Sequence, residues 1–237
     1  WNDYFFIFLP VIKKGFFSLG TIITIPVLLE ACVQGPQLFP GNSTGTLGGV
    51  SPSETKGPFP IKTPSELVQS NIVSDRKGIA LLINFKILNI NTNTPLAGAK
   101  IDLWHCDAEG YYSEYGGSGM QSVDFTNAHF LRGRQTTDAN GEVNFISIYP
   151  GWYRGRAPHL HVEILDNNSR SLLVTQVAFP EDISGKVYTQ SPYKGQADTS
   201  NTGDNVFVDS LSANMANSVT GNNTDGYKLV KTIKVKP

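Results

Sequence analysis

From about residue 78 onward, apolar and polar residues alternate with a period of two, and this alternation constrains the fold more than any other feature of the chain. In Ile79–Leu88, the side chains of Leu81, Ile83, Phe85 and Ile87 fall on one face of the expected strand. A strand that buries one face needs a second layer to cover that face. The pattern therefore predicts strands that pack in layers.

The rest of the chain continues this pattern. Further strands are predicted at Ala99–Cys106, Glu142–Ile148, His159–Leu165, Ser171–Phe179 and Tyr227–Val235. The run Asp138-Ala139-Asn140-Gly141 predicts a tight hairpin turn. Only Glu181–Val187 has the pattern of a short helix, and residues 189–226 have that of a long polar loop. We expect an all-β fold, an antiparallel β-sandwich with long loops and little helix.

Three parts are expected along the chain. Residues 1–32 are expected to be an export leader, because Lys13-Lys14 is followed by the apolar stretch Gly15–Leu29. Residues 33–58 are rich in glycine, proline and serine, which is the composition of a flexible linker. Residues 59–237 are expected to form one domain, which is long enough to bury a hydrophobic core.

The end of the leader, Leu29-Glu30-Ala31-Cys32, resembles the lipobox of bacterial lipoproteins, although Glu30 departs from that pattern. We therefore expect an exported protein of the periplasm or cell envelope, with Cys32 as the candidate site of a lipid anchor. That anchor would be the chain's only contact with a membrane, and a plain signal peptide or a single anchor helix is the alternative. The formal net charge of -1 gives no electrostatic footprint for nucleic acid.

The run His159-Leu160-His161 is the first candidate site. On a strand, residues i and i+2 point the same way, so both imidazoles face one side and Leu160 faces the other. An isolated His-x-His is more often a pair of histidines that bond to the backbone. Here the pair holds two of only four histidines and follows a loop rich in glycine, proline and arginine, which favours a metal site.

Two tyrosines stand near expected strand ends. Tyr149 precedes a proline at the end of one strand, and Tyr112 lies just past the end of another, while Tyr111 and Tyr153 are rivals that spacing does not exclude. Two phenolates and two imidazoles are an unusual ligand set, because thiols and imidazoles suit zinc or copper, and carboxylates suit calcium or magnesium. Phenolate is a hard anionic ligand for ferric iron. Two phenolates and one hydroxide also neutralise Fe(III), which lowers the cost of burying it.

Several short runs together resemble one known family. They are Glu54-Thr55-Lys56-Gly57-Pro58-Phe59, Gly110-Tyr111-Tyr112-Ser113, Phe130-Leu131-Arg132-Gly133, Tyr149-Pro150 and Arg156-Ala157-Pro158-His159-Leu160-His161. This combination resembles the intradiol ring-cleavage dioxygenases, the superfamily of catechol, hydroxyquinol and protocatechuate dioxygenases. The resemblance covers roughly residues 54–180 and is nearest to the exported, single-domain relatives of the protocatechuate β subunit.

The resemblance implies a non-haem Fe(III) centre held by Tyr112, Tyr149, His159 and His161. Tyr112 would stay bound, and Tyr149 would leave when substrate arrives and act as a base. The implied reaction inserts both atoms of O2 into a small aromatic diol of the catechol type and gives a cis,cis-muconate-type diacid. A homo-oligomer is compatible with the resemblance.

The resemblance also assigns two supporting residues. Arg156, three residues before the first histidine, would lie beside the substrate and stabilise charge that develops on its ring. Gln176 would match a glutamine that supports the ligands. The loop between Tyr149 and His159 is shorter than in the best-known members, and the helical dimerisation region of the catechol-cleaving branch is absent.

Two alternatives from other functional classes remain at this point. The first is a zinc or copper hydrolase built on His159 and His161, with His105 or Asp107 as the third ligand. The second is a non-catalytic β-sandwich module that stacks a ligand on aromatic side chains. Its stacking residues would be Trp104, Trp152 and Tyr153.

Overall fold

The structure is a computed structural model that describes residues 49–117 and 119–237 of the chain. The expected leader at residues 1–32, Cys32 included, lies outside the described residues, as does the linker up to residue 48. Within the described ranges, no helix combines the length and the apolar character needed to cross a membrane.

Strands make up most of the regular structure, and the two helices are short. The elements are β1 (Ala80–Asn89), β2 (Thr94–Pro95), β3 (Lys100–Trp104), β4 (Arg132–Thr136), β5 (Glu142–Ile148), β6 (His159–Leu165), β7 (Ser171–Ala178), α1 (Glu181–Val187), α2 (Leu211–Asn214), β8 (Ser218–Asn222) and β9 (Gly226–Val235).

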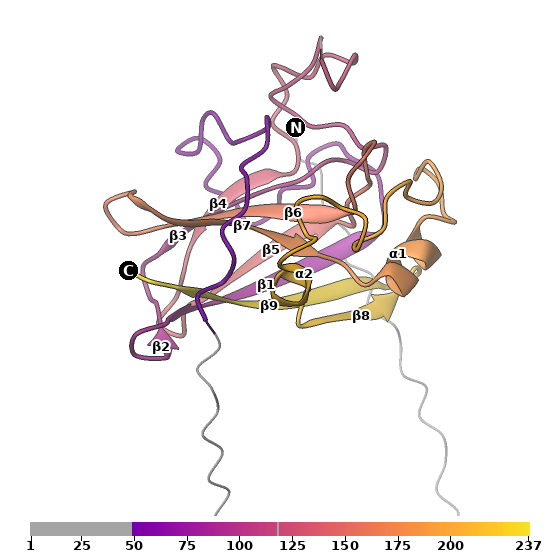
Figure 1. The fold of residues 1–237 in the computed structure, drawn as a ribbon. Coiled ribbons are helices and arrows are strands. Elements are labelled where there is room, and N and C mark those ends of the chain that lie inside the picture. The colour runs from indigo at the N-terminus through magenta and orange to yellow at the C-terminus, as the bar shows by residue number, and fades with distance from the viewer. Residues whose placement is uncertain (1–48, 118) are drawn as a thin grey trace, which may run out of the picture. The chain divides into compact units, whose positions relative to one another are not determined.

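These strands form two layers (Figure 1). One sheet has the order β2-β1-β9-β8, with β5 also paired to β1, and the other has the order β4-β3-β6-β7. Buried aliphatic and aromatic side chains of both sheets form one core cluster between the layers. The expected β-sandwich is confirmed, and β5, β6 and α1 have the expected bounds.

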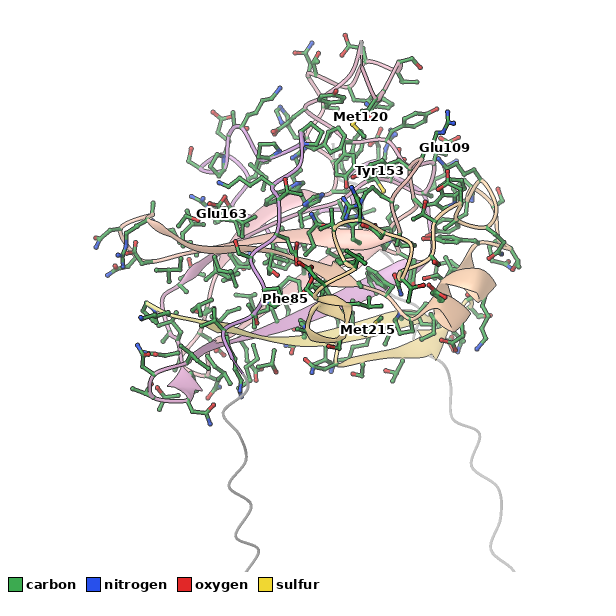
Figure 2. All side chains as sticks on the ribbon, in the orientation of Figure 1. Phe85, Glu109, Met120, Tyr153, Glu163 and Met215 are labelled. Atoms are coloured by element: carbon green, nitrogen blue, oxygen red, sulfur yellow. The ribbon has the colours of Figure 1, made fainter. Side chains whose placement is uncertain are left out.

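The period-two pattern of the sequence corresponds to burial in the structure. On β1, Leu81, Ile83, Phe85 and Ile87 are buried, and every residue between them is more exposed. Strand β6 is buried along its whole length, because one face lies on the core and the other lies beneath loops. In Figure 2, Phe85 lies between the layers, whereas Tyr153 lies beyond the sheet that contains β6.

Strand pairing departs from the expected all-antiparallel pattern in one place. β9 pairs parallel to β1 over nine residue pairs, from Leu81 with Tyr227 to Asn89 with Val235. The segment expected to be one long polar loop, residues 189–226, also contains α2 and β8. The chain uses this segment to cross from one sheet to the other before it returns as β9 beside β1.

The domain begins before residue 59, where the sequence placed its boundary. The backbone N–H of Ser51 donates to Lys234 O at 2.9 Å, and that of Glu54 donates to Val174 O at 2.8 Å. The Glu54 carboxylate accepts bonds from Ser210 and Asn214 at 2.8 and 2.9 Å. Backbone and side-chain bonds thus attach the end of the expected linker to the folded domain.

The outer face of the β4-β3-β6-β7 sheet carries the candidate site. Trp104 of β3 lies opposite His161 of β6, and His161 lies opposite Gln176 of β7. Residues 55–59 pass over this face, where a Cβ on Gly57 would lie 3.4 Å from His161 Cε1. Gly57 has φ +62, a backbone conformation that favours glycine. The imidazoles are therefore enclosed by sheet on one side and by loops on the other.

Candidate active site

The two histidines of β6 project from the same face of the strand, as their spacing predicts. His159 and His161 are buried, and their Nε2 atoms lie 3.1 Å apart. The ring of Trp104 stacks on His161 at a centroid distance of 5.1 Å with an interplanar angle of 1°. This packing fixes the direction in which the second imidazole points.

Both imidazoles are held in the neutral form. Burial, with a further contribution from Arg156, lowers the pKa of His159 to about 3. Burial and the neighbouring His159 lower the pKa of His161 well below its usual value. His159 Nδ1 lies 2.6 Å from Ala157 O, so Nδ1 carries the proton and donates it, which leaves a lone pair on Nε2. A neutral imidazole with a free Nε2 lone pair is the form that binds metals.

Tyr112 lies with the histidines, as the sequence predicts. Its ring is 6.1 Å from the His161 ring between centroids, and it stacks on Phe59 at 4.0 Å with an interplanar angle of 7°. Its hydroxyl is buried without a hydrogen-bond partner among the described residues. Burial raises the pKa of Tyr112 well above its usual value, so the phenol would ionise only next to a cation.

Gln121, which is not among the residues predicted from the sequence, holds the backbone of the Tyr112 loop. Its Oε1 accepts the N–H of Tyr112 at 2.7 Å, and its Nε2 donates to the carbonyls of Tyr112, Tyr115 and Val123. Arg132 is also buried and donates to Ser113 Oγ at 2.8 Å. No sequence pattern marks Gln121, since its partners are backbone groups.

The second tyrosine at the site is Tyr153. Its ring lies 5.6 Å from His159 and 5.7 Å from Tyr112 between centroids, and its hydroxyl is 3.5 Å from His159 Nε2. Burial raises the pKa of Tyr153 to about 12, and the nearby Arg156 opposes that shift. The structure therefore brings together Tyr112, Tyr153, His159 and His161.

Tyr149 is elsewhere, and the prediction that places it among the ligands is wrong on this structure. Its ring packs on Phe179 at 4.6 Å, within the core cluster between the sheets. Its hydroxyl is hydrogen-bonded to Ser184 Oγ at 2.8 Å. Rings of two other tyrosines of that cluster, Tyr188 and Tyr227, surround it at 6.2 and 5.8 Å.

The alternation along β5 explains this placement. Alternate residues of the strand, Val143, Phe145 and Ser147, are buried on one face. Tyr149 is the next residue in this alternation, so its side chain points to the core. The chain then crosses toward the other sheet through Gly151, where a Cβ would lie 2.5 Å from both Asp107 O and Ala108 O. Only glycine can pass this close to that backbone, and the crossing delivers Tyr153 to the histidines.

Arg156 and Gln176 lie at the edge of the site and bond to each other. Arg156 Nη2 donates to Gln176 Oε1 at 2.5 Å, and Arg156 Nη1 lies 3.3 Å from the Tyr153 hydroxyl and 3.5 Å from His159 Nε2. Gln176 Nε2 donates to Thr55 O at 2.9 Å. The guanidinium therefore places a fixed positive charge beside the phenol and the imidazole.

The ligand set fits a single metal ion. Two nitrogens that each lie about 2.1 Å from one ion stand about 3 Å apart when the angle between them is close to a right angle, and the two Nε2 atoms are 3.1 Å apart. The Tyr112 hydroxyl and His161 Nδ1 are buried polar atoms without partners in the described chain. A buried phenol oxygen without a partner is destabilising, and a cation at the point where these side chains converge would give it one.

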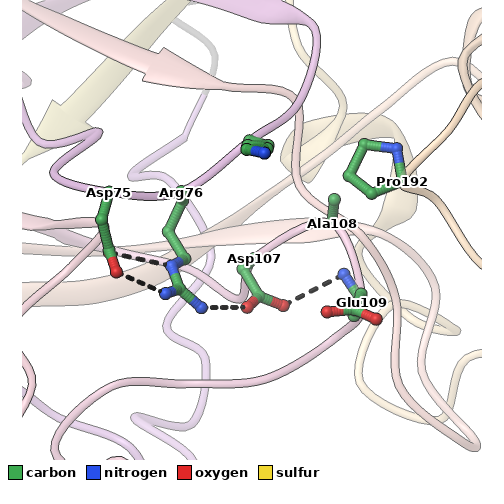
Figure 3. Close-up of a pocket in the computed structure, with 7 residues that line it drawn as sticks. Asp75, Arg76, Asp107, Ala108, Glu109 and Pro192 are labelled. Carbon is green, nitrogen blue, oxygen red and sulfur yellow. Dashed lines mark hydrogen bonds and ion pairs between the residues drawn. The ribbon is translucent and has the colours of Figure 1, made fainter.

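The third ligands considered for a zinc or copper site, His105 and Asp107, bond to other partners in the structure. Within the described ranges, no three His, Cys, Asp or Glu side chains gather closely enough to hold a metal. His105 bonds to Cys106 O and to Ser147 Oγ, each at 2.7 Å. Asp107 pairs with Arg76 and accepts the N–H of Glu109, on the wall of a separate cavity of about 240 Å³ (Figure 3).

The three aromatic residues of the alternative binding module do not form a shared platform. Trp104 is buried beneath His161. Trp152 donates from its ring nitrogen to Gly195 O at 2.8 Å and lies under the Lys194 ammonium. Tyr153 faces Tyr112 and His159. A ligand could not stack on all three rings.

Burial of His105 has a consequence for acid stability. Burial lowers the pKa of His105 to about 4, from a usual value of 6.5. Below about pH 6.5 the unfolded chain binds a proton that the folded chain does not, so stability present above that pH is lost as the pH falls toward 4. The loss in the free energy of unfolding reaches roughly 3 kcal/mol.

We expect His105→Gln to make the pH dependence of unfolding shallower by about 1.4 kcal/mol per pH unit between pH 6.5 and 4.5. Urea unfolding of the iron-free protein between pH 6.5 and 4.5 measures it, and equal slopes in the two proteins would contradict the expectation.

Comparison with known proteins gives a consistent result. A family model described as "Dioxygenase" matches residues 59–191. A curated relative, the hydroxyquinol 1,2-dioxygenase of Rhizobium sp. (strain MTP-10005), is 32% identical over 153 residues, which cover 56% of this chain and 49% of that protein. The protocatechuate 3,4-dioxygenase beta chain of Burkholderia cepacia is 32% identical over 100 residues, covering 37% of this chain and 40% of that one. The chain thus spans about half, or less, of the length of these relatives.

A solved structure matches over more of its length. It is an intradiol ring-cleavage dioxygenase from Tetranychus urticae, with a TM-score of 0.71 and 29% sequence identity. The alignment covers 80% of this chain and 95% of that one. The similarity therefore extends over most of the described domain.

Proposed function

This chain belongs to the intradiol ring-cleavage dioxygenase family, and we propose that it inserts both atoms of O2 into a small catechol-type diol at a non-haem Fe(III) centre. The product would be a cis,cis-muconate-type diacid. One observation carries the proposal, namely the closed set of ring contacts among Tyr112, Tyr153, His159 and His161.

The proposed ligands are those four residues, with Tyr153 in the role that the resemblance implies for Tyr149. Two phenolates and two neutral imidazoles suit ferric iron better than zinc or calcium. Ferric iron held by these four side chains would supply Lewis acidity toward the oxygens of a diol. Two anionic ligands also offset most of the ion's charge, so that it can be buried.

Tyr153 has the properties of a base for the diol. Burial raises the pKa of this phenol to about 12, so its phenolate binds a proton strongly. Tyr153 is also only partly buried, whereas Tyr112 is fully enclosed under Phe59. The Tyr153 oxygen would accept a proton from a diol hydroxyl, and Tyr112 would stay in place.

Arg156 would act on the substrate through its charge. Its Nη1 is 3.3 Å from the Tyr153 oxygen, so it lies at the place where the diol would enter. A guanidinium is cationic at every accessible pH and is a good donor to an oxygen or a ring that gains negative charge. Gln176 accepts a hydrogen bond from Nη2 of the same guanidinium.

Iron loading tests the proposal directly. Phenolate bound to Fe(III) absorbs visible light, so the protein should turn red to burgundy with added ferric iron and lose the colour when a chelator removes it. It should then consume one O2 per diol with at least one of catechol, protocatechuate and hydroxyquinol, measured with an oxygen electrode. A zinc-loaded sample is the control and should be colourless and inactive. A protein that stays colourless with iron and consumes no O2 would overturn the proposal.

A further inference from the structure

Arg156 is held on three sides. Its Nη1 faces Tyr153 and His159, and its Nη2 donates to Gln176. On the third side, its Nε lies 3.0 and 2.8 Å from the two carboxylate oxygens of Asp204. Asp204 is therefore the one anionic partner of this guanidinium among the described residues.

Asp204 comes from a distant segment that the family resemblance does not cover. It lies between α1 and α2, 48 residues after Arg156 in the sequence, and it is fully buried. The same carboxylate accepts the backbone N–H of Ala157 and of Val206, each at 2.8 Å. A buried carboxylate with this many donors is fixed in position, and it fixes them in return.

Phe207 closes the same corner. Its ring lies 5.7 Å from the Arg156 guanidinium carbon and 6.3 Å from the His159 ring. Phe207 N donates to Asp204 O at 3.1 Å, so the two residues belong to one turn. This turn covers the guanidinium and separates the Arg156–Asp204 pair from solvent.

We propose that Asp204 is a positioning residue, which fixes the Arg156 guanidinium so that Nη1 faces the reacting centre. The assignment rests on the proposed function, because it gives Arg156 a substrate to face. Within the described chain, the Asp204 carboxylate bonds to Arg156 and to the backbone N–H groups of Ala157 and Val206, and not to any of the four proposed ligands. Its effect on the reaction runs through Arg156, whose Nε it binds.

The chemistry of the two partners explains why Asp204, and not Gln176, would determine this geometry. Gln176 offers one neutral oxygen to one end of the guanidinium, which leaves Arg156 free to turn about that contact. Asp204 offers a charge and two oxygens at Nε, close to where the side chain joins the guanidinium. A charge-assisted bond at that position restricts the last torsions of the side chain.

Hydrogen exchange of arginine Nε–H groups tests the contact without any turnover. In the full chain without added iron, the Arg156 Nε–H should exchange with solvent at least tenfold more slowly than that of Arg154, which is exposed. Asp204→Asn should abolish most of this protection, because the amide places an N–H where a carboxylate oxygen accepted. Assignment follows from loss of the signal in Arg156→Gln.

A matched control is available in the sheet that contains β6. Arg134 Nε donates to Asp102 at 2.5 Å, and both side chains of that pair are largely buried. Asp102→Asn should expose the Arg134 Nε–H and leave that of Arg156 unchanged. If the Arg156 Nε–H exchanges as fast as Arg154 in the unaltered chain, or stays protected in Asp204→Asn, the proposal is overturned.

Kinetics of the iron-loaded chain test the consequence for the reaction. Asp204→Asn should lower kcat roughly 10- to 100-fold, as the loss of an outer partner of a metal site typically does. KM should change less than kcat, and the visible absorption should persist, because no ligand is removed. In an Arg156→Gln background the same substitution should lower kcat no further, and full additivity would refute an action through Arg156.

The exchange and kinetic measurements distinguish failure of the proposed function from failure of the role of Asp204. An iron-loaded chain without dioxygenase turnover would sink the proposed function, while the exchange data would still decide whether Asp204 fixes Arg156. A normal kcat in Asp204→Asn, together with lost Nε–H protection, would show that the contact exists and does not serve the reaction, which overturns the positioning role.

Discussion

His161→Ala is expected to lose bound iron, visible colour and dioxygenase turnover together. His161 is one of two imidazoles whose Nε2 atoms lie 3.1 Å apart, and it is enclosed between Trp104 and residues 55–59. Loss of an outer partner of a metal site costs 10- to 100-fold in affinity, so loss of a ligand should cost more than about 100-fold. Iron per chain after gel filtration and oxygen uptake measure both effects.

The same substitution at an exposed histidine serves as the control. His129 is exposed and pairs with Glu114, with 2.9 Å between Nδ1 and the carboxylate. His129→Ala should keep the iron and the colour. A His161→Ala protein with full iron content and full turnover would refute the ligand assignment, and so would equal losses in the two variants.

Tyr153→Phe is expected to have the second largest effect, and it separates two ligand assignments. The change removes one of two phenolates, so the visible absorption should weaken and shift while some iron remains bound by Tyr112 and the histidines. It also removes the proposed base for the diol, and a general base contributes roughly 100- to 10,000-fold to rate. Absorption spectra and kcat of the iron-loaded variant measure the two consequences.

Tyr149→Phe is the matched comparison, since it makes the same change at the position that the sequence favoured. Tyr149 bonds to Ser184 Oγ in the inter-sheet core, and Ser184 Oγ also donates to Pro180 O. We therefore expect normal colour and turnover, with a loss of about 1 kcal/mol in the free energy of unfolding. Lost iron in Tyr149→Phe, with normal behaviour of Tyr153→Phe, would restore the original assignment.

The fold could be predicted because its signals are local. Burial of alternate side chains on β1 and the turn before β5 are set by neighbours in the sequence. The parallel pairing of β9 with β1 joins segments more than 140 residues apart, and local periodicity contains no information on that register. The same limit applies to α2 and β8, which lie in a segment with no strong alternation.

At the site, the sequence predicts the direction of the histidines, whereas the structure has Tyr153 beside them in place of Tyr149. The i, i+2 spacing of His159 and His161 determines their common face on β6. For Tyr149, the same rule applied along β5 would have placed it in the core with Val143 and Phe145. The alternation along β5 is thus a better guide to the direction of Tyr149 than the proline that follows it.

The roles of Asp204 and Gln121 could not be predicted from the sequence. Each bonds to partners brought near by the tertiary fold or by an irregular loop, and several of those partners are backbone amides. A backbone amide has no side-chain identity, so no residue pattern points to it. Such residues are found only once the loops have been traced in space.

The position of β9 affects how the domain can be made. Its ten residues stand in the interior of a sheet, between β1 and β8, and contribute Leu229, Ile233 and Val235 to the core. Strand β1 therefore has one unpaired edge during synthesis until β9 has left the ribosome. At that stage the nascent chain exposes the unpaired backbone N–H and C=O groups of β1, with which strands of other chains can pair. We expect holdase chaperones to bind it at that stage, and C-terminal truncation at Gly226 to give aggregates instead of a smaller folded domain.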